Sequence, residues 1–302
     1  MSELYGAIEA GGTKFVCAVG TGPDDIVAET RFPTDDPEST IGSATAFLAD
    51  QQGVHGRLSA IGVASFGPVE LRLDHSRYGW ITTTPKPGWS GTPVIRPLMD
   101  AFEVPVGFDT DVNGAALGEG RWGAAQGVAS FVYVTVGTGI GGGAVVDGNP
   151  LHGLVHPEMG HVPVARKPGD GFSGTCPFHG DCFEGMACGP ALAQRWRIPA
   201  VRLAGAHLEE ARATQAWYVA QGLRAIVYML APQRIVLGGG VMGMPGLIEL
   251  VRIELRRALA GYPGLPEHDE PNFVVAPRLG SRAGVAGAFV LAELAADRDE
   301  RR

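Results

Sequence analysis

This chain has fewer basic than acidic residues. Its 24 Lys and Arg residues stand against 32 Asp and Glu residues, which gives a formal net charge of −8. Binding to a nucleic acid or to an anionic membrane needs Lys and Arg clustered over a surface, and the sequence contains no such cluster. We therefore expect neither a nucleic acid nor a membrane as a partner.

Long apolar runs and cysteines are also few. The apolar stretches, such as residues 130–136, are too short to span a bilayer, and Met1 to Ile8 has no basic segment before an apolar run. Four cysteines in 302 residues do not make a disulfide scaffold. We predict a cytoplasmic protein in which Cys17 and Cys188 are small buried residues.

Glycine, by contrast, is abundant, with 45 residues. Many of them cluster in three places, at Gly11-Gly12, 137–143 and 238–240. A residue without a Cβ atom lets the backbone turn sharply or approach a ligand closely. We therefore expect three tight turns that could each contact a ligand.

The apolar pattern of the first half predicts strands that alternate with helices. Strands are expected at residues 4–8, 15–19 and 26–32, followed by a helix after Pro37 and a buried strand at 58–64. This order is typical of an α/β domain.

A similar order begins again after residue 130, where strand 131–136, a glycine turn and strand 144–146 repeat the first unit of the chain. The repeat predicts two related α/β domains. We place them at 1–113, completed by the C-terminal helix 283–302, and at 114–282. Further elements are expected at 209–230 (helix), 234–237 (strand), 246–259 (helix) and 284–296 (helix).

Two aspartates follow the strand expected at 104–108, in the run Asp109-Thr110-Asp111-Val112-Asn113. The carboxyl ends of strands are where α/β sheets place their ligand sites. Asp111 or Asn113 could simply cap the helix expected at 115–121. Alternatively, one aspartate could be a base, because a kinase that phosphorylates a hydroxyl needs a carboxylate to accept its proton.

The three glycine turns could each face a nucleotide. The runs 9–14 and 135–143 could present backbone N–H groups to phosphate oxygens, and 235–242 brings three glycines to one strand end, which suits a flat adenosine. The plain structural alternatives are a hairpin turn, a bulged hairpin and a strand-to-helix turn. No Gly-Lys-Ser/Thr follows the second run, so it is not a Walker A loop.

A metal site is indicated within the irregular segment 153–185. The run Cys176-Pro177-Phe178-His179-Gly180-Asp181-Cys182 offers two thiolates and an imidazole, ligands that zinc prefers in sets of four. On spacing alone, the fourth ligand could be His152, His156 or His161. A segment of this length needs something to order it, and zinc is the candidate.

Taken together, these motifs resemble the ROK family, named for repressors, open reading frames and kinases, from about Leu4 to Ala295. The run 9–14 looks like the family's first phosphate motif, 136–141 like its second and 238–240 like its adenosine turn. The family's zinc motif is matched by Glu158-Met159-Gly160-His161. The resemblance therefore singles out His161 as the fourth ligand beside Cys176, His179 and Cys182, and it returns His152 and His156 to the surface.

The resemblance implies a fold of two ribonuclease H-like domains of the actin-like ATPase class around a central cleft, with a zinc-bound loop. It makes Asp111 the catalytic base. The implied sugar contacts are Gly67, Thr110, Asp111, Glu158, His161 and Glu184. The implied ATP contacts are Glu9, Gly11, Gly12, Thr13, Lys14, Thr135, Gly137, Thr138, Gly139, Pro190, Gly238, Gly239 and Gly240.

Within the family, Thr110-Asp111 with Asn113, the zinc-binding run and residues 83–89 look like the fructokinase branch. Thr110 stands where glucokinase-like members usually have Asn, and Glu9 replaces the usual Asp. The resemblance implies phosphorylation of fructose to fructose 6-phosphate by ATP with Mg²⁺, structural Zn²⁺ and a homodimer. The alternatives are a glucokinase or broad hexokinase of the same family and a sugar-sensing repressor, for which no helix-turn-helix fits before the first strand.

Overall fold

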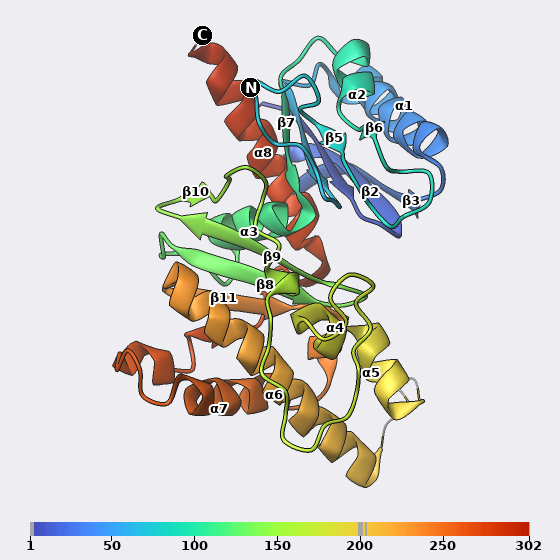
Figure 1. The fold of residues 1–302 in the computed structure, drawn as a ribbon. Coiled ribbons are helices and arrows are strands. Elements are labelled where there is room, and N and C mark those ends of the chain that lie inside the picture. The colour runs from blue at the N-terminus through green and yellow to red at the C-terminus, as the bar shows by residue number, and fades with distance from the viewer. Residues whose placement is uncertain (1–2, 199–201, 203, 302) are drawn as a thin grey trace. The chain divides into compact units, whose positions relative to one another are not determined.

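The computed structural model describes residues 3–198, 202 and 204–301. Contacts between Cα atoms divide the chain into two compact units, whose elements are labelled in Figure 1. Unit 1 comprises Met1–Gln126, Asn149–Pro157 and Leu279–Arg302, and unit 2 comprises Gly127–Gly148 and Glu158–Arg278.

Unit 1 contains a five-stranded sheet in the order β3-β2-β1-β4-β7. The first three strands form an antiparallel meander, whereas β4 is parallel to β1 and β7 is parallel to β4. The strands are β1 (Tyr5–Ala10), β2 (Lys14–Gly22), β3 (Asp25–Pro33), β4 (Ala60–Ser65) and β7 (Val106–Thr110), and the short β5 (Trp80–Ile81) and β6 (Thr92–Pro93) pair separately.

Helices cover both faces of this sheet because successive side chains of a strand point to opposite faces. Ile8 of β1 belongs to the apolar core that includes Leu48 of α1 (Pro37–His55). The preceding residue, Ala7, belongs to the core that includes residues of α8 (Ala283–Glu300). The last helix of the chain thus belongs to the first unit.

The boundaries of unit 1 differ from those predicted for the first domain. The predicted boundary after residue 113 places most of α3 (Asp111–Trp122) in the second domain, but this helix packs on α8. The contact is very close, since a Cβ atom at Gly287 would lie 1.7 Å from the Gly114 carbonyl oxygen. Unit 1 also includes residues 149–157, together with β10 (Asn149–Pro150), α2 (Arg96–Ala101) and the 3-10 helix η5 (Gly280–Arg282).

Unit 2 is built on a second sheet, in which β9, β8, β11 and β12 are neighbours in that order. The strand β8 is antiparallel to β9 and parallel to β11, which is itself parallel to β12. The predicted strand, glycine turn, strand unit is therefore present. The strands are β8 (Phe131–Val136), β9 (Ile140–Val146), β11 (Arg234–Gly238) and β12 (Val274–Val275).

Two long helices, α6 (Gly205–Leu230) and α7 (Leu247–Leu259), pack on each other in unit 2. The segment 153–185 is largely irregular, as predicted, until α4 (Phe183–Ala187) begins directly after Cys182. The remaining helices of this unit are α5 (Gly189–Trp196) and the 3-10 helices η1 (Met159–His161), η3 (Gly240–Gly243) and η4 (Pro266–Asp269).

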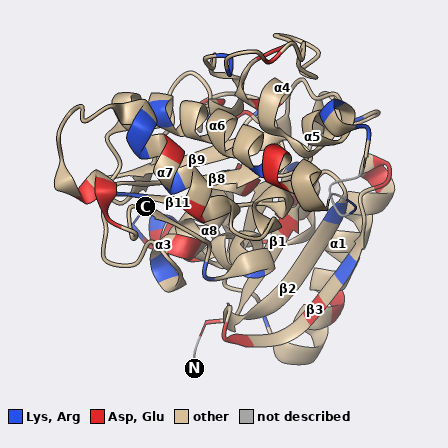
Figure 2. Cartoon of the chain, turned by 90° about the horizontal axis from the view of Figure 1, so that it is seen from below, with Lys and Arg blue, Asp and Glu red and all other residues tan. Residues whose placement is uncertain are grey.

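Charged side chains are spread over many elements, and Figure 2 shows basic and acidic residues interspersed along the chain. Several arginines pair with an acid close by in sequence, in the pairs Arg72–Glu70, Arg96–Asp100, Arg212–Glu209 and Arg257–Glu254. No helix in the described part of the chain has the length and hydropathy needed to cross a membrane.

Candidate active site and metal centre

The turn after β7 gives the two predicted aspartates different structural positions. β7 ends at Thr110, whose Oγ1 accepts a hydrogen bond from the Asn113 N–H at 3.1 Å and so caps α3. Thr110 therefore has the capping role for which the sequence suggested Asp111 or Asn113. Asp111 occupies the first position of the helix, where the positive end of the helix dipole favours a carboxylate, and its Oδ1 accepts the Val112 N–H at 2.8 Å.

Asp109, by contrast, lies in the interior with an exposed fraction of 1%. Its Oδ1 accepts hydrogen bonds from the Thr110 N–H and from Asn113 Nδ2, both at 2.7 Å. Its Oδ2 lies 2.9 Å from Nε2 of His152. Asp109 therefore holds the backbone of the turn, and its two oxygens are already engaged by the protein.

The segment 149–157 brings two histidines to unit 1, and the expectation that they are surface residues is wrong for His156 but not for His152, whose side chain is 39% exposed. His156 is buried, with its Nε2 accepting the Val69 N–H at 3.2 Å. His152 is half-exposed and pairs with Asp109, whose hydrogen bond and charge raise the pKa of the imidazole despite its partial burial. These contacts join residues 87 and 43 positions apart, so no local sequence signal predicts them.

The first glycine turn joins β1 to β2. The Gly11 N–H donates to the Lys14 carbonyl oxygen at 3.0 Å, and Thr34 Oγ1 donates to the Gly11 carbonyl oxygen at 2.6 Å. A Cβ atom at Gly11 would lie 2.8 Å from the Lys14 carbonyl oxygen. The sequence therefore needs a glycine here for the turn itself, while Thr13 is exposed and Gly12 and Lys14 are half-buried.

Glu9 lies beside this turn but its side chain is directed to the start of α8. It accepts a hydrogen bond from the Val285 N–H, and a Cβ atom at Gly284 would lie 2.5 Å from its Cδ. Burial raises the pKa of Glu9, an effect that Lys14 and Arg31 partly offset. Its Oε2 is buried without a hydrogen-bond partner among the described residues. The structure thus places Glu9 at a helix N-terminus rather than within the turn.

The second and third glycine turns come together in unit 2. Gly239 has a φ of +96°, and a Cβ atom there would lie 2.4 Å from the Val136 carbonyl oxygen. The Gly189 N–H, next to Pro190, donates to the Gly137 carbonyl oxygen at 2.7 Å. The structure therefore gathers the predicted ATP contacts from 137–139, 190 and 238–240 around the ends of β8 and β11.

Glu184 of α4 binds directly to the end of the second turn. Its Oε2 accepts the Ile140 N–H at 2.9 Å, and a Cβ atom at Gly139 would lie 2.7 Å from the same oxygen. Glu184, which is a predicted sugar contact, thus accepts a hydrogen bond from the second glycine turn, which is predicted to contact the phosphates of ATP. The helix that carries Glu184 begins directly after the last cysteine of the metal-binding run.

The four predicted zinc ligands form one cluster in unit 2. One ligand atom from each of His161, Cys176, His179 and Cys182 lies within 4.8 Å of the others. The Sγ atom of Cys176 is 3.7 Å from Nδ1 of both histidines, and Cys182 Sγ is 3.6 Å from His161 Nδ1. A tetrahedral Zn²⁺ with Zn–S of about 2.3 Å and Zn–N of about 2.05 Å separates S from N by about 3.6 Å. The residues therefore fit zinc.

The irregular segment has a second anchor besides this cluster. The Asp170 carboxylate accepts hydrogen bonds from Tyr218 of α6 and from Arg195 of α5, whose guanidinium lies 4.3 Å from the centre of the Phe172 ring. Burial opposes ionisation of Asp170, but the hydrogen bonds from Tyr218 and Arg195 outweigh it and lower the pKa of the carboxyl. A half-buried ion pair therefore holds the segment to two helices.

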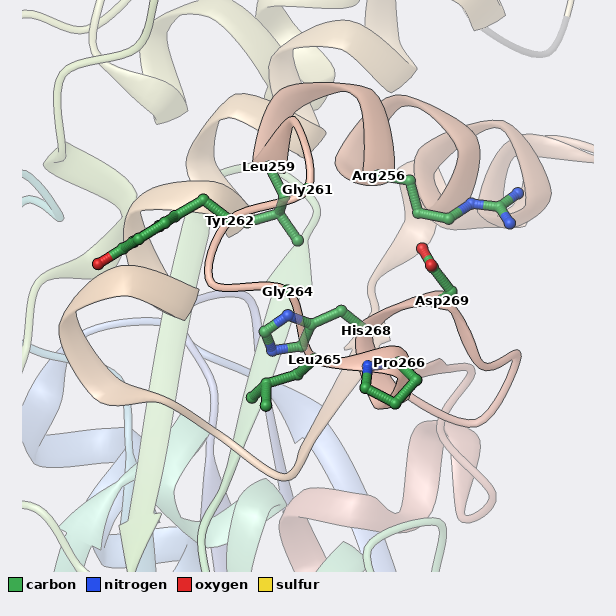
Figure 3. Close-up of a pocket in the computed structure, with 9 residues that line it drawn as sticks. All are labelled: Arg256, Leu259, Gly261, Tyr262, Gly264, Leu265, Pro266, His268 and Asp269. Carbon is green, nitrogen blue, oxygen red and sulfur yellow. The ribbon is translucent and has the colours of Figure 1, made fainter.

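Elsewhere in unit 2, a cavity of about 310 Å³ lies between the end of α7 and η4 (Figure 3). Leu259, Tyr262, Leu265 and His268 are among its lining residues. The glycine turns, Glu184 and the cysteine–histidine cluster do not line it. We therefore assign it no part in the site.

Comparison with known proteins extends these observations to the whole chain. The ROK family matches residues 5–295. A fructokinase of Zymomonas mobilis is 44% identical over 292 residues, which cover 96% of this chain and 96% of that protein.

Solved structures show the same fold. The ROK hexokinase of Thermus thermophilus has a TM-score of 0.78 and 31% identity, with 98% of this chain and 99% of that chain covered. The ROK family glucokinase of Streptomyces griseus, in complex with glucose and AMPPNP, has a TM-score of 0.75 and 25% identity, with 96% and 99% covered. The expected actin-like ATPase fold is therefore confirmed, and the chain belongs to the ROK family.

Proposed function

We infer that this protein is an ATP-dependent sugar kinase, and we propose that it converts fructose to fructose 6-phosphate. The observation that carries the proposal is the 44% identity, over nearly the full length of both chains, to a fructokinase. The matched hexokinase and glucokinase are less similar, at 31% and 25%. Fructose is therefore favoured over glucose as the substrate.

The proposed base is Asp111. Asp111 lies at the first position of α3, where the helix dipole favours a carboxylate, and its proposed role is to accept the proton of a primary hydroxyl as the γ-phosphate is attacked. Mg²⁺ bound with ATP supplies neutralisation of the phosphate charge. Phosphoryl transfer depends mainly on positioning and electrostatics, so the position of the base decides its effect.

The proposed sugar contacts also include Gly67, Thr110, Glu158, His161 and Glu184. Nδ1 of His161 faces both cysteine sulfurs, so Nε2 on the opposite side of the ring is the nitrogen available to a sugar hydroxyl. Oε2 of Glu184 accepts a backbone N–H, which leaves Oε1 to accept from a hydroxyl. Zinc would hold this part of the site rigid by fixing the backbone on either side of it.

We propose that ATP binds to the glycine turns, with backbone N–H groups directed to its phosphates. The proposed ATP contacts are Glu9, Gly11, Gly12, Thr13, Lys14, Thr135, Gly137, Thr138, Gly139, Pro190, Gly238, Gly239 and Gly240. We also expect a cytoplasmic homodimer, which the family resemblance and the composition suggest and sedimentation of the purified protein can test.

The substrate assignment predicts a clear preference among hexoses. With saturating ATP and Mg²⁺, kcat/KM for fructose should exceed that for glucose and for mannose by at least about tenfold, because the polar groups of the site would be left unpaired by the wrong hydroxyl pattern. Initial rates of ADP formation across the three sugars measure it. Equal or higher values for glucose would point to a glucokinase or a broad hexokinase.

If the second glycine turn binds ATP, a bulky side chain in that turn should weaken ATP binding without unfolding the protein. A Cβ atom at Gly137 would meet no atom within 4 Å, so Gly137→Val should fold normally while its bulk obstructs the phosphates. We expect the KM for ATP to rise by about tenfold or more, with the KM for fructose little changed. Gly171→Val is a matched control, since Gly171 is also unobstructed but lies outside the turns. Normal ATP affinity in Gly137→Val would contradict the assignment.

A further inference from the structure

The partners of Asp109 form a closed network in unit 1. Three donors surround its buried carboxylate, namely the Thr110 N–H, Asn113 Nδ2 and His152 Nε2. Two of them belong to the turn that presents Asp111, and the third belongs to residues 149–157, far away in the sequence. His152 is therefore the connection between this segment and the turn.

The chemistry of the carboxylate fixes the orientation of both neighbours. An ionised carboxylate only accepts hydrogen bonds, so His152 must carry its proton on Nε2, and Asn113 must direct its NH₂ group to Asp109. Asn113 Nδ2 also lies 3.4 Å from His152 Nε2, and since both are donors this is a packing contact. The Asn113 Oδ1 atom is buried without a partner among the described residues. The hydrogen bond to Asp109 therefore sets the orientation of the amide, although this orientation leaves that oxygen without a donor.

The same network reaches the proposed base through the helix cap. Asn113 donates its side chain to Asp109 and its backbone N–H to Thr110 Oγ1, and Thr110 immediately precedes Asp111. If His152 were lost, Oδ2 of Asp109 would be left buried without its partner, and the carboxylate could rotate away from Thr110 and Asn113. A small displacement of the base is costly, since about 1 Å can reduce the rate by about 10²-fold.

We propose that His152 is a positioning residue of the kinase reaction: by pairing with Asp109, it holds Thr110 and Asn113 in the arrangement that orients Asp111. The inference rests on the proposed function and on Asp111 as the base. His152 need not touch the sugar or ATP. It contributes by holding the turn after β7 in one conformation.

The test compares His152→Ala with His152→Gln, whose amide can still donate a hydrogen bond to Asp109. We expect His152→Ala to lower kcat for fructose by about tenfold or more, with the KM for ATP unchanged within about twofold. His152→Gln should return kcat to within about threefold of the wild-type value. His75→Ala is the matched control, because His75 also faces a carboxylate of unit 1, Glu70 at 3.6 Å, and should leave kcat unchanged.

A double-variant cycle distinguishes positioning from a merely structural role. If His152 acts through Asp111, adding His152→Ala to Asp111→Asn should lower kcat by less than about twofold, because the oriented base is already absent. If the reductions in kcat of the two single variants multiply fully in the double variant, this inference is wrong while the proposed function stands. The same holds if His152→Ala folds and its kcat is unchanged. A wild-type protein that does not phosphorylate fructose, or an Asp111→Asn variant with normal turnover, would overturn the proposed function and this inference with it.

Discussion

Asp111→Asn is expected to lower kcat for fructose phosphorylation by about a hundredfold or more, with little change in the KM for fructose. The amide keeps the shape and the hydrogen bonding of the side chain but cannot accept the proton of the hydroxyl. Asp111 is half-buried at the first position of α3, and an amide of the same size fits the same space, so the variant should fold. Steady-state rates and a thermal unfolding curve measure the two effects.

Asp109→Asn is the comparison variant, and its effect should differ in kind. The amide keeps one acceptor oxygen where the buried carboxylate offers two oxygens to three donors, and its NH₂ group faces another donor, so we expect a loss of stability of about 1–3 kcal/mol. Its kcat should fall less than that of Asp111→Asn, because the base itself remains. Near-normal turnover in Asp111→Asn together with a complete loss in Asp109→Asn would assign the base to Asp109 instead.

Purified protein is expected to contain about one equivalent of zinc, and Cys176→Ala should lose it. Three ligands within seven residues and His161 close the site, and metal binding of this kind supplies folding free energy. We expect the midpoint of thermal unfolding to fall by about 10 °C or more. Metal analysis of the wild type below about half an equivalent, or unchanged zinc in Cys176→Ala, would contradict the assignment.

Cys188→Ala provides the control for the zinc prediction. Cys188 is buried in the same unit and contacts Thr175, but it lies outside the ligand cluster. Its zinc content should equal that of the wild type. Cys176→Ala should also lower kcat/KM for fructose, because α4 begins directly after Cys182 and carries Glu184, whose position then depends on the ordered loop.

Much of this architecture could be predicted from the sequence because its signals are local. Three local signals are enough for these predictions: apolar runs that become buried strands such as β4 and β8, glycines at the ends of β1, β8 and β11, and a cysteine–histidine run of seven residues. The motif at 158–161 selects His161 as the fourth ligand, and the structure places its side chain within 4.8 Å of Cys176, His179 and Cys182. Local patterns also suffice for the start of α1, where Asp36 caps the helix before Pro37.

What could not be predicted depends on contacts between distant residues. His152 and His156 resemble surface residues in a polar segment, and only the folded chain brings them to Asp109 and Val69. The cap of α3 falls to Thr110 because β7 ends there, which hydrophobic periodicity cannot locate to the residue. Glu9 faces α8, which lies at the other end of the sequence, so its orientation follows from tertiary packing alone.

The most direct test of the proposed function is to identify the product formed from D-fructose and Mg²⁺-ATP by ³¹P and ¹³C nuclear magnetic resonance. The account predicts fructose 6-phosphate and ADP in equal amounts, formed by the wild type and at least about a hundredfold more slowly by Asp111→Asn. A phosphate on another hydroxyl would show that the sugar is placed differently. Absence of any fructose phosphate, with glucose phosphorylated under the same conditions, would contradict the proposal that this ROK protein is a fructokinase.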